Sequence, residues 1–114
     1  MIIRRAEMTS ERREKMRGGD GVVGITNLVD PGKLPHGRLL AEVTIEPGAS
    51  IGEHAHAEET EYFIILSGVG MVADDGANRE VAPGDVVITG GGATHAIRNT
   101  GSSPLRLVAL ILSR

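Results

Sequence analysis

Three histidines and one glutamate have the types and spacing needed to hold a metal ion. His54 and His56 are two positions apart, and because side chains alternate along a strand, both imidazoles point to the same side. Glu61 enters the next strand-like segment and offers an oxygen from another direction, and His95 completes the set from a distant strand. Three neutral imidazoles and a carboxylate suit Mn, Fe, Co, Ni, Cu or Zn. We therefore expect one divalent transition metal ion, with open positions for substrate, water or dioxygen if the ion is six-coordinate.

Several polar residues near this set have two interpretations each. His36 lies in a turn and is interpreted as a plain loop residue, with a place on the rim of the site as the alternative. Glu58 and Glu59 are favoured as solvated loop residues over an alternate ligand or an acid–base group. Glu42 is favoured on the outer face of its strand over a place in the cavity. The sequence assigns no catalytic residue.

Two arginines and two turn residues complete the list of candidates. Arg98 and Arg106 are cations that an anionic substrate could use, but isolated arginines are more often surface charges. Asn99 and Gly84 are expected to shape turns rather than to bind a ligand.

The composition of the 114-residue chain excludes several classes of protein. There is no cysteine, so the chain has no disulfide, thiolate ligand or cysteine nucleophile. The formal net charge of -3 argues against a nucleic-acid-binding surface, which would need clustered lysine and arginine. No apolar run approaches the roughly 18 residues of a membrane span or the core of a signal peptide. We expect a cytoplasmic protein with a small-molecule ligand and neither a membrane nor a nucleic-acid partner.

Short β-rich stretches separated by turn residues predict an all-β sandwich or barrel, since the chain has sixteen glycines and five prolines. Besides the His54 segment, strands are expected at residues 22–29, 38–45, 61–66, 69–73, 79–82, 86–88, 95–98 and 105–112. Residues 9–17 begin with a capping-type pair and end in cations, which predicts a short helix or helical turn with a solvated charged face. We expect an N-terminal arm over residues 1–20 and one barrel domain over residues 21–114.

Two of the expected strands are apolar on both faces. In residues 61–66 and 105–112, the positions on either side are mostly Ile, Leu, Val or aromatic. A strand with two apolar faces needs a cover on each side. In a chain this short the second cover is expected from another subunit, so we predict a homodimer.

The chain resembles the cupins in two sequence motifs. The first motif, G-x5-H-x-H-x4-E-x6-G, is matched by Gly48, His54, His56, Glu61 and Gly68. The second motif, G-x5-P-x-G-x2-H-x3-N, is matched by Gly84, Gly92, His95 and Asn99. The motif proline is replaced by Gly90, which leaves the turn before His95 less constrained in φ. The resemblance implies a double-stranded β-helix (jelly-roll) barrel, metal ligation by the matched histidines and glutamate, and frequently a homodimer.

Resemblance to the cupins also implies a range of functions, from decarboxylases such as oxalate decarboxylase to dioxygenases and sugar isomerases, so the fold alone does not select one. We expect a small metalloenzyme acting on a carboxylate- or carbohydrate-derived molecule. The alternatives are a non-catalytic ligand-binding or sensing module and a metal-free structural relic.

Overall fold

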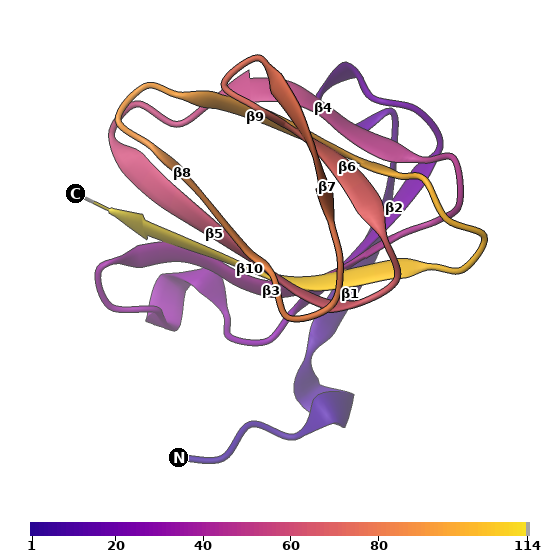
Figure 1. Ribbon diagram of the computed structural model, residues 1–114. Helices are drawn as coiled ribbons and strands as arrows, with labels where there is room; N and C mark the ends of the chain where they lie inside the picture. Colours follow the sequence, from indigo (N-terminus) through magenta and orange to yellow (C-terminus); the bar gives the residue numbers. More distant parts are fainter. Residues whose placement is uncertain (114) are drawn as a thin grey trace.

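The computed structural model describes residues 1–113 and consists almost entirely of antiparallel strands (Figure 1). The ten strands are β1 (Thr9–Glu14), β2 (Val22–Asn27), β3 (Gly37–Ile45), β4 (Ser50–Ala55), β5 (Glu59–Ser67), β6 (Gly70–Asp74), β7 (Ala77–Val81), β8 (Val86–Gly90), β9 (Thr94–Asn99) and β10 (Leu105–Ser113). Three 3-10 turns lie before β3: η1 (Arg5–Glu7), η2 (Met16–Gly18) and η3 (Pro31–Lys33). Among the described residues, no helix is long and apolar enough to cross a membrane.

The strands form two sheets that face each other and close into a barrel (Figure 1). One sheet has six strands in the order β1-β2-β3-β10-β5-β8, and the other has four in the order β4-β9-β6-β7. Consecutive strands such as β4 and β5 belong to different sheets, so the chain passes back and forth across the core. The predicted all-β jelly-roll barrel is confirmed.

The core lies between the sheets because one side of each central strand is apolar. In β3, Ala41, Val43 and Ile45 are buried as their alternation predicted, whereas Glu42 and Thr44 face outward. The buried apolar residues of the other strands include Val23, Ile25, Ile51, Phe63, Ile65, Val72, Ile97, Leu105, Leu107 and Ala109. Each fully buried Ile, Leu, Val or Phe side chain stabilises the fold by about 1.5–3 kcal/mol relative to exposure.

The outer face of β5 and β8 is apolar and uncovered. Ile64 and Leu66 of β5 are 38% and 43% exposed, and Val86 and Ile88 of β8 are 54% and 60% exposed. The predicted apolar second face of β5 is therefore present, and the described residues 1–113 provide no cover for it.

Residues 9–14 form strand β1, so the prediction that this stretch is helical is wrong. The expected N-terminal helical turn exists only as η1 and η2, which flank the strand. The six residues of β1 are all polar and all exposed, so their sequence carries no hydrophobic period. Their conformation is set by antiparallel pairing with β2, and this long-range pairing overrides the local capping signal.

A bulge in β4 turns both histidines of this segment into the barrel. Ile51 pairs with Ile97 and His54 pairs with His95, so β4 has one residue more than β9 in this interval. Ile51 is buried, and regular alternation would place the residue before His54 on the inner side. The extra residue reverses the alternation and directs His54 inward, with His56 immediately after the strand.

Candidate metal centre

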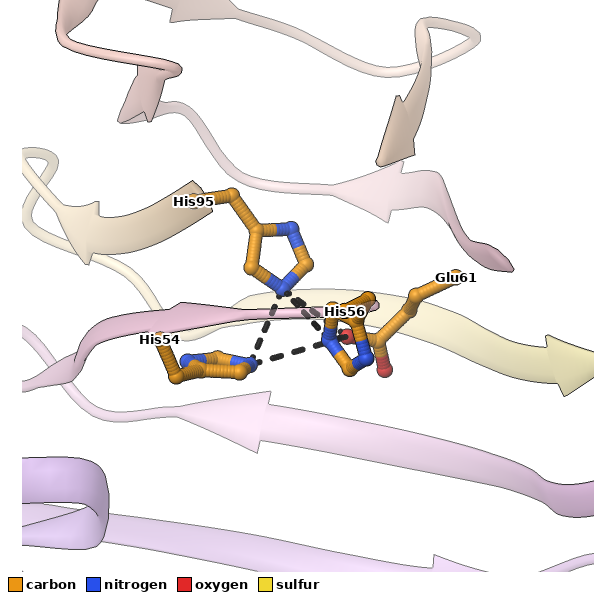
Figure 2. Close-up of side chains that lie close together, drawn as sticks. All are labelled: His54, His56, Glu61 and His95. Atoms are coloured by element: carbon orange, nitrogen blue, oxygen red, sulfur yellow. Dashed lines mark hydrogen bonds and ion pairs between the residues drawn. The ribbon is translucent and has the colours of Figure 1, made fainter. Parts of the chain in front are cut away.

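The side chains of His54, His56, Glu61 and His95 point toward one another inside the barrel (Figure 2). One donor atom from each lies within 4.8 Å of the others. Nε2 of His95 is 3.0 Å from Nε2 of His54 and 3.2 Å from Nε2 of His56. Oε1 of Glu61 is 2.9 Å from Nε2 of both His56 and His95. The imidazoles thus present the same ring nitrogen, and the carboxylate one oxygen, to a common point.

Nδ1 is the ring nitrogen of His54 and His56 that faces away from the cluster, and in His54 a hydrogen bond at this atom orients the ring. Nδ1 of His54 is 2.8 Å from the carbonyl oxygen of Gly52. Nδ1 of His56 faces Oε1 of Glu59 at 3.6 Å. Because a carbonyl oxygen accepts hydrogen bonds, Nδ1 of His54 is the donor in its contact with Gly52, which leaves the lone pair of the neutral ring on Nε2. This is the form of imidazole that binds a metal ion.

His95 is held firmly although Gly90 replaces the motif proline. Its Nδ1 is 2.9 Å from Oγ1 of Thr89. Its ring stacks on Phe63, with the ring centroids 4.8 Å apart and the planes 9° apart. His95 is 1% exposed. These two side chains fix the ring, so the glycine turn over residues 90–92 does not leave His95 loosely presented.

The chemistry of the donor set fits a cation. Three imidazole nitrogens and a carboxylate oxygen that lie this close repel one another unless positive charge lies between them. Burial raises the pKa of Glu61, but hydrogen bonds and charge from imidazoles that carry a proton on Nε2, His54 and His95 first, outweigh it and leave the pKa at about 2. A metal ion at the same point would replace those protons as the source of positive charge. Glu61 is therefore an ionised donor at neutral pH. The set suits a divalent transition metal ion without selecting which one.

A cavity of about 360 Å³ opens beside the donor cluster. Four charged residues line it in addition to the donors: Glu11 and Arg13 of β1, Arg17 of η2 and Arg38 of β3. Strand β1 therefore forms one wall of the cavity, with alternate residues facing it. The sequence analysis missed this wall because it interpreted residues 9–17 as a helix with a solvated face. Glu11 and Arg13 are two residues apart, which places their side chains on the same side only if β1 is a strand.

Arg38 reaches the cavity through a second bulge. The pairing of β3 with β10 includes Leu39 and Gly37 but skips Arg38, so its side chain is free to leave the regular alternation. The Arg38 guanidinium binds Glu59 through two nitrogens, with Nη2 2.9 Å from Oε1. This hydrogen bonding raises the pKa of Arg38 and lowers the pKa of Glu59. Glu59 is thus neither a solvated loop residue nor a member of the donor cluster. Its carboxylate pairs with Arg38 and lies 3.6 Å from Nδ1 of His56.

The other charged candidates lie away from the donor cluster. Glu42 is on the outer face of β3, where it forms ion pairs with Arg5 at 3.1 Å and Arg106 at 2.7 Å. Arg98 forms an ion pair with Asp20 at 2.6 Å. The favoured interpretations of Glu42, Arg98 and Arg106 agree with these positions.

The expected turn residues do shape turns. Nδ2 of Asn99 donates to the carbonyl oxygens of Ile45 and Ser103, both at 2.8 Å. Gly84 has φ of 94°, a conformation that favours glycine. His36 is exposed in a turn and lies outside the donor cluster.

A sequence profile described as the cupin domain matches residues 41–111. The chain belongs to the cupin family. A protein of Thermotoga maritima named "Oxalate-binding protein" is 38% identical to this cupin over 113 residues, which cover 98% of this chain and 93% of the relative. The resemblance inferred from the two motifs is confirmed.

Solved structures agree with this assignment. The crystal structure of a predicted oxalate decarboxylase from Thermotoga maritima matches this cupin with a TM-score of 0.94 and 37% identity, and the match covers 100% of both chains.

A longer relative, mannose-1-phosphate guanylyltransferase of Escherichia coli, is 27% identical over 69 residues, which are 60% of this chain but 14% of that protein. The latter match is limited to a small part of the guanylyltransferase.

Proposed function

We propose that this cupin binds one divalent transition metal ion and uses it to hold a small dicarboxylate, with oxalate as the first candidate. The ion would be held by His54, His56, Glu61 and His95. The observation that carries the proposal is the convergence of these donors beside a cavity lined by arginines. When bound, the ion supplies a Lewis-acid centre for carboxylate oxygens. The surrounding chain orients the donors, as the contacts of Gly52 and Thr89 with the histidines indicate.

The lining of the cavity supports an anionic ligand. Arg13, Arg17 and Arg38 come from three separate segments and all line it. A guanidinium group matches the planar geometry of a carboxylate and can donate two parallel hydrogen bonds. The volume of about 360 Å³ lies near the lower end of the range for ligand pockets, which favours a small molecule. The Thermotoga maritima relative is named for oxalate binding, and the crystal structure from the same organism is described as a predicted oxalate decarboxylase, in agreement with this class.

Binding without turnover is the form of the proposal that the cavity supports best. Decarboxylation of oxalate needs a group that delivers a proton. Two glutamates line the cavity, but Glu61 is a proposed metal ligand and Glu11 accepts a hydrogen bond from Arg13 at 2.8 Å.

The second candidate is a metalloenzyme of the decarboxylase, dioxygenase or isomerase class acting in the same cavity. The position of Glu11 favours this candidate. Among residues 1–113, Glu11 is the one carboxylate that lines the cavity without belonging to the donor cluster.

Metal analysis and calorimetry on untagged protein test this proposal. We expect one ion per chain, and we expect oxalate to bind the metal-loaded protein with a rise in Tm and not to bind chelator-treated protein. Glu61→Gln should lower the metal content, whereas Glu80→Gln, on the exposed strand β7, should not. Oxalate binding that is equal with and without metal, or absent in both, contradicts the proposal. Formation of formate and CO₂ from oxalate, lost in Glu11→Gln, would establish the second candidate.

We also propose that this cupin forms a homodimer through the outer face of the six-stranded sheet. The proposal is supported by the apolar outer face of β5 and β8, where Ile64, Leu66, Val86 and Ile88 are exposed on adjacent strands. A contiguous apolar patch of this kind is typical of protein–protein interfaces. A second copy of the chain would provide the cover that the first copy lacks.

A further inference from the structure

Arg17 has an unfavourable backbone conformation beside the proposed metal centre. Its φ is 54° and its ψ is 30°, in the left-handed region, and Lys15 is left-handed as well. Residues other than glycine, asparagine and aspartate seldom adopt this conformation. Backbone strain of this kind is concentrated at functional sites, where the surrounding structure maintains it. The strain at Arg17 therefore makes its side chain a candidate functional group.

The turn that carries Arg17 is fixed to β4, the strand that carries the first histidine of the cluster. A Cβ atom on Gly52 would overlap the carbonyl oxygen of Arg17, and a Cβ atom on Gly19 would overlap that of Ser50. The two backbones are thus in direct contact. Ser50 N donates to the carbonyl oxygen of Asp20 at 2.8 Å, and Asp20 N donates to Oγ of Ser50 at 2.9 Å. These contacts fix the position of Arg17 relative to the histidines.

Arg17 also differs from the other arginines of the cavity in its charge balance. Arg13 donates to Glu11 at 2.8 Å, and Arg38 is bound to Glu59. Within residues 1–113, Arg17 takes part in no ion pair. Arg17 is an exposed residue at the lining of the cavity, and a guanidinium group that lacks a protein counter-charge is suited to an anion from solution.

We propose that Arg17 is the specificity-determining residue of the cavity and pairs with the carboxylate of the ligand that is not taken up at the donor cluster. The inference rests on the proposed function and names how the ligand is selected. A dicarboxylate has a second negative group for Arg17, whereas a monocarboxylate has none. Arg17 therefore favours dicarboxylates over monocarboxylates of similar size.

Calorimetric titration of metal-loaded protein with oxalate and with acetate tests this inference. Arg17→Gln should weaken oxalate binding about tenfold or more, since it removes a charge-assisted hydrogen bond, and should change acetate binding by less than about twofold. Arg12→Gln is the matched control, because Arg12 is exposed on β1 and lies outside the lining of this cavity among the described residues. It should leave both affinities within about twofold. Metal content, measured on every variant, should stay unchanged.

Arg17→Gly separates recognition from a structural role. Glycine adopts the left-handed conformation without strain, so this variant should raise Tm by about 2 °C or more and still weaken oxalate binding as much as Arg17→Gln. A purely structural role predicts instead that Tm and affinity change in the same direction. Oxalate affinity that is unchanged in both variants, or oxalate and acetate affinities that fall equally, overturns the inference alone. If the wild type binds neither ligand, the proposed function fails and the inference fails with it.

Discussion

The carbonyl oxygen of Gly52 lies 2.8 Å from Nδ1 of His54 and accepts its hydrogen bond. Gly52 is in the β4 bulge that turns His54 inward, and the space that a Cβ atom would need is filled by the carbonyl oxygen of Arg17. One residue without a side chain therefore supports both a proposed metal ligand and the turn that carries the proposed anion-recognition residue. A change at Gly52 should affect both together.

The first prediction is that Gly52→Ala weakens metal binding about tenfold or more and destabilises the protein by about 1–3 kcal/mol. The new Cβ atom has to displace either the Arg17 turn or the carbonyl that orients His54. Competition with a chelator measures the metal affinity, and urea unfolding measures the stability. Gly24→Ala is the control, because a Cβ atom there meets nothing closer than Thr44 at 3.9 Å. Equal losses of metal affinity and of stability in the two variants would contradict the role of Gly52.

The second prediction concerns the hydroxyl group that holds His95. Thr89→Val keeps the side-chain shape but leaves Nδ1 of the buried His95 without its partner, so we expect a loss of about 1–3 kcal/mol in stability and about 10–100-fold in metal affinity. Thr89→Ser keeps the hydroxyl and loses a buried methyl group, so its stability should fall by about 1 kcal/mol while metal affinity stays within about threefold. If both variants lose metal affinity to the same extent, the hydroxyl is not what orients His95.

The four residues of the donor cluster were predictable because each lies in a short segment that matches one of two known motifs. The reason that His54 faces the barrel was not. Ile51 and His54 are three residues apart and both lie on the inner side, which regular strand alternation forbids. The bulge between them depends on pairing with β9, more than forty residues later in the chain, and a local pattern carries no information about such a pairing.

The cavity wall was unpredictable for a related reason. Glu11 and Arg13 belong to a stretch without apolar residues, so neither helix nor strand periodicity is visible in it. Arg38 follows the outward-facing set of β3 by alternation, and a bulge opposite β10 frees it from that pattern. Sequence reasoning therefore identified the four residues of the donor cluster but not the arginines that line the cavity beside it.

The third prediction is a pH dependence of stability at Glu42, far from the donor cluster. Hydrogen bonding from Arg106, opposed by burial and aided by Arg5, lowers the pKa of Glu42 below its ordinary value of 4.5. Because the pKa is lower in the folded state, the contribution of Glu42 to stability is fully present above pH 4.5 and is lost as the pH falls through the folded-state pKa. At pH 7 we expect the free energy of unfolding of the wild type to exceed that of Glu42→Gln by about 0.5–1 kcal/mol.

Urea unfolding of wild type and Glu42→Gln from pH 7 to the acid limit of folding checks this window. The difference between the two proteins should be constant at neutral pH and should disappear in acid. Added salt should reduce it, because the ion pairs are partly exposed. Glu80→Gln serves as the control, since Glu80 is exposed and forms no ion pair in the described part of the chain. A difference that persists in acid would rule out the charge of Glu42 as its cause.

The fourth prediction is that the apolar outer face of β5 and β8 holds two copies of the chain together. Light scattering should give wild type twice the chain mass of 12.0 kDa. The double variant Ile64→Lys and Ile88→Lys should be monomeric, because a dimer would have to bury four unpaired ammonium groups at a cost of several kcal/mol each. Val69→Lys adds a charge at an exposed apolar residue between β5 and β6, outside the strand face, and should remain dimeric. A wild-type mass of one chain at high concentration would contradict the dimer, and dissociation of Val69→Lys would place the interface elsewhere.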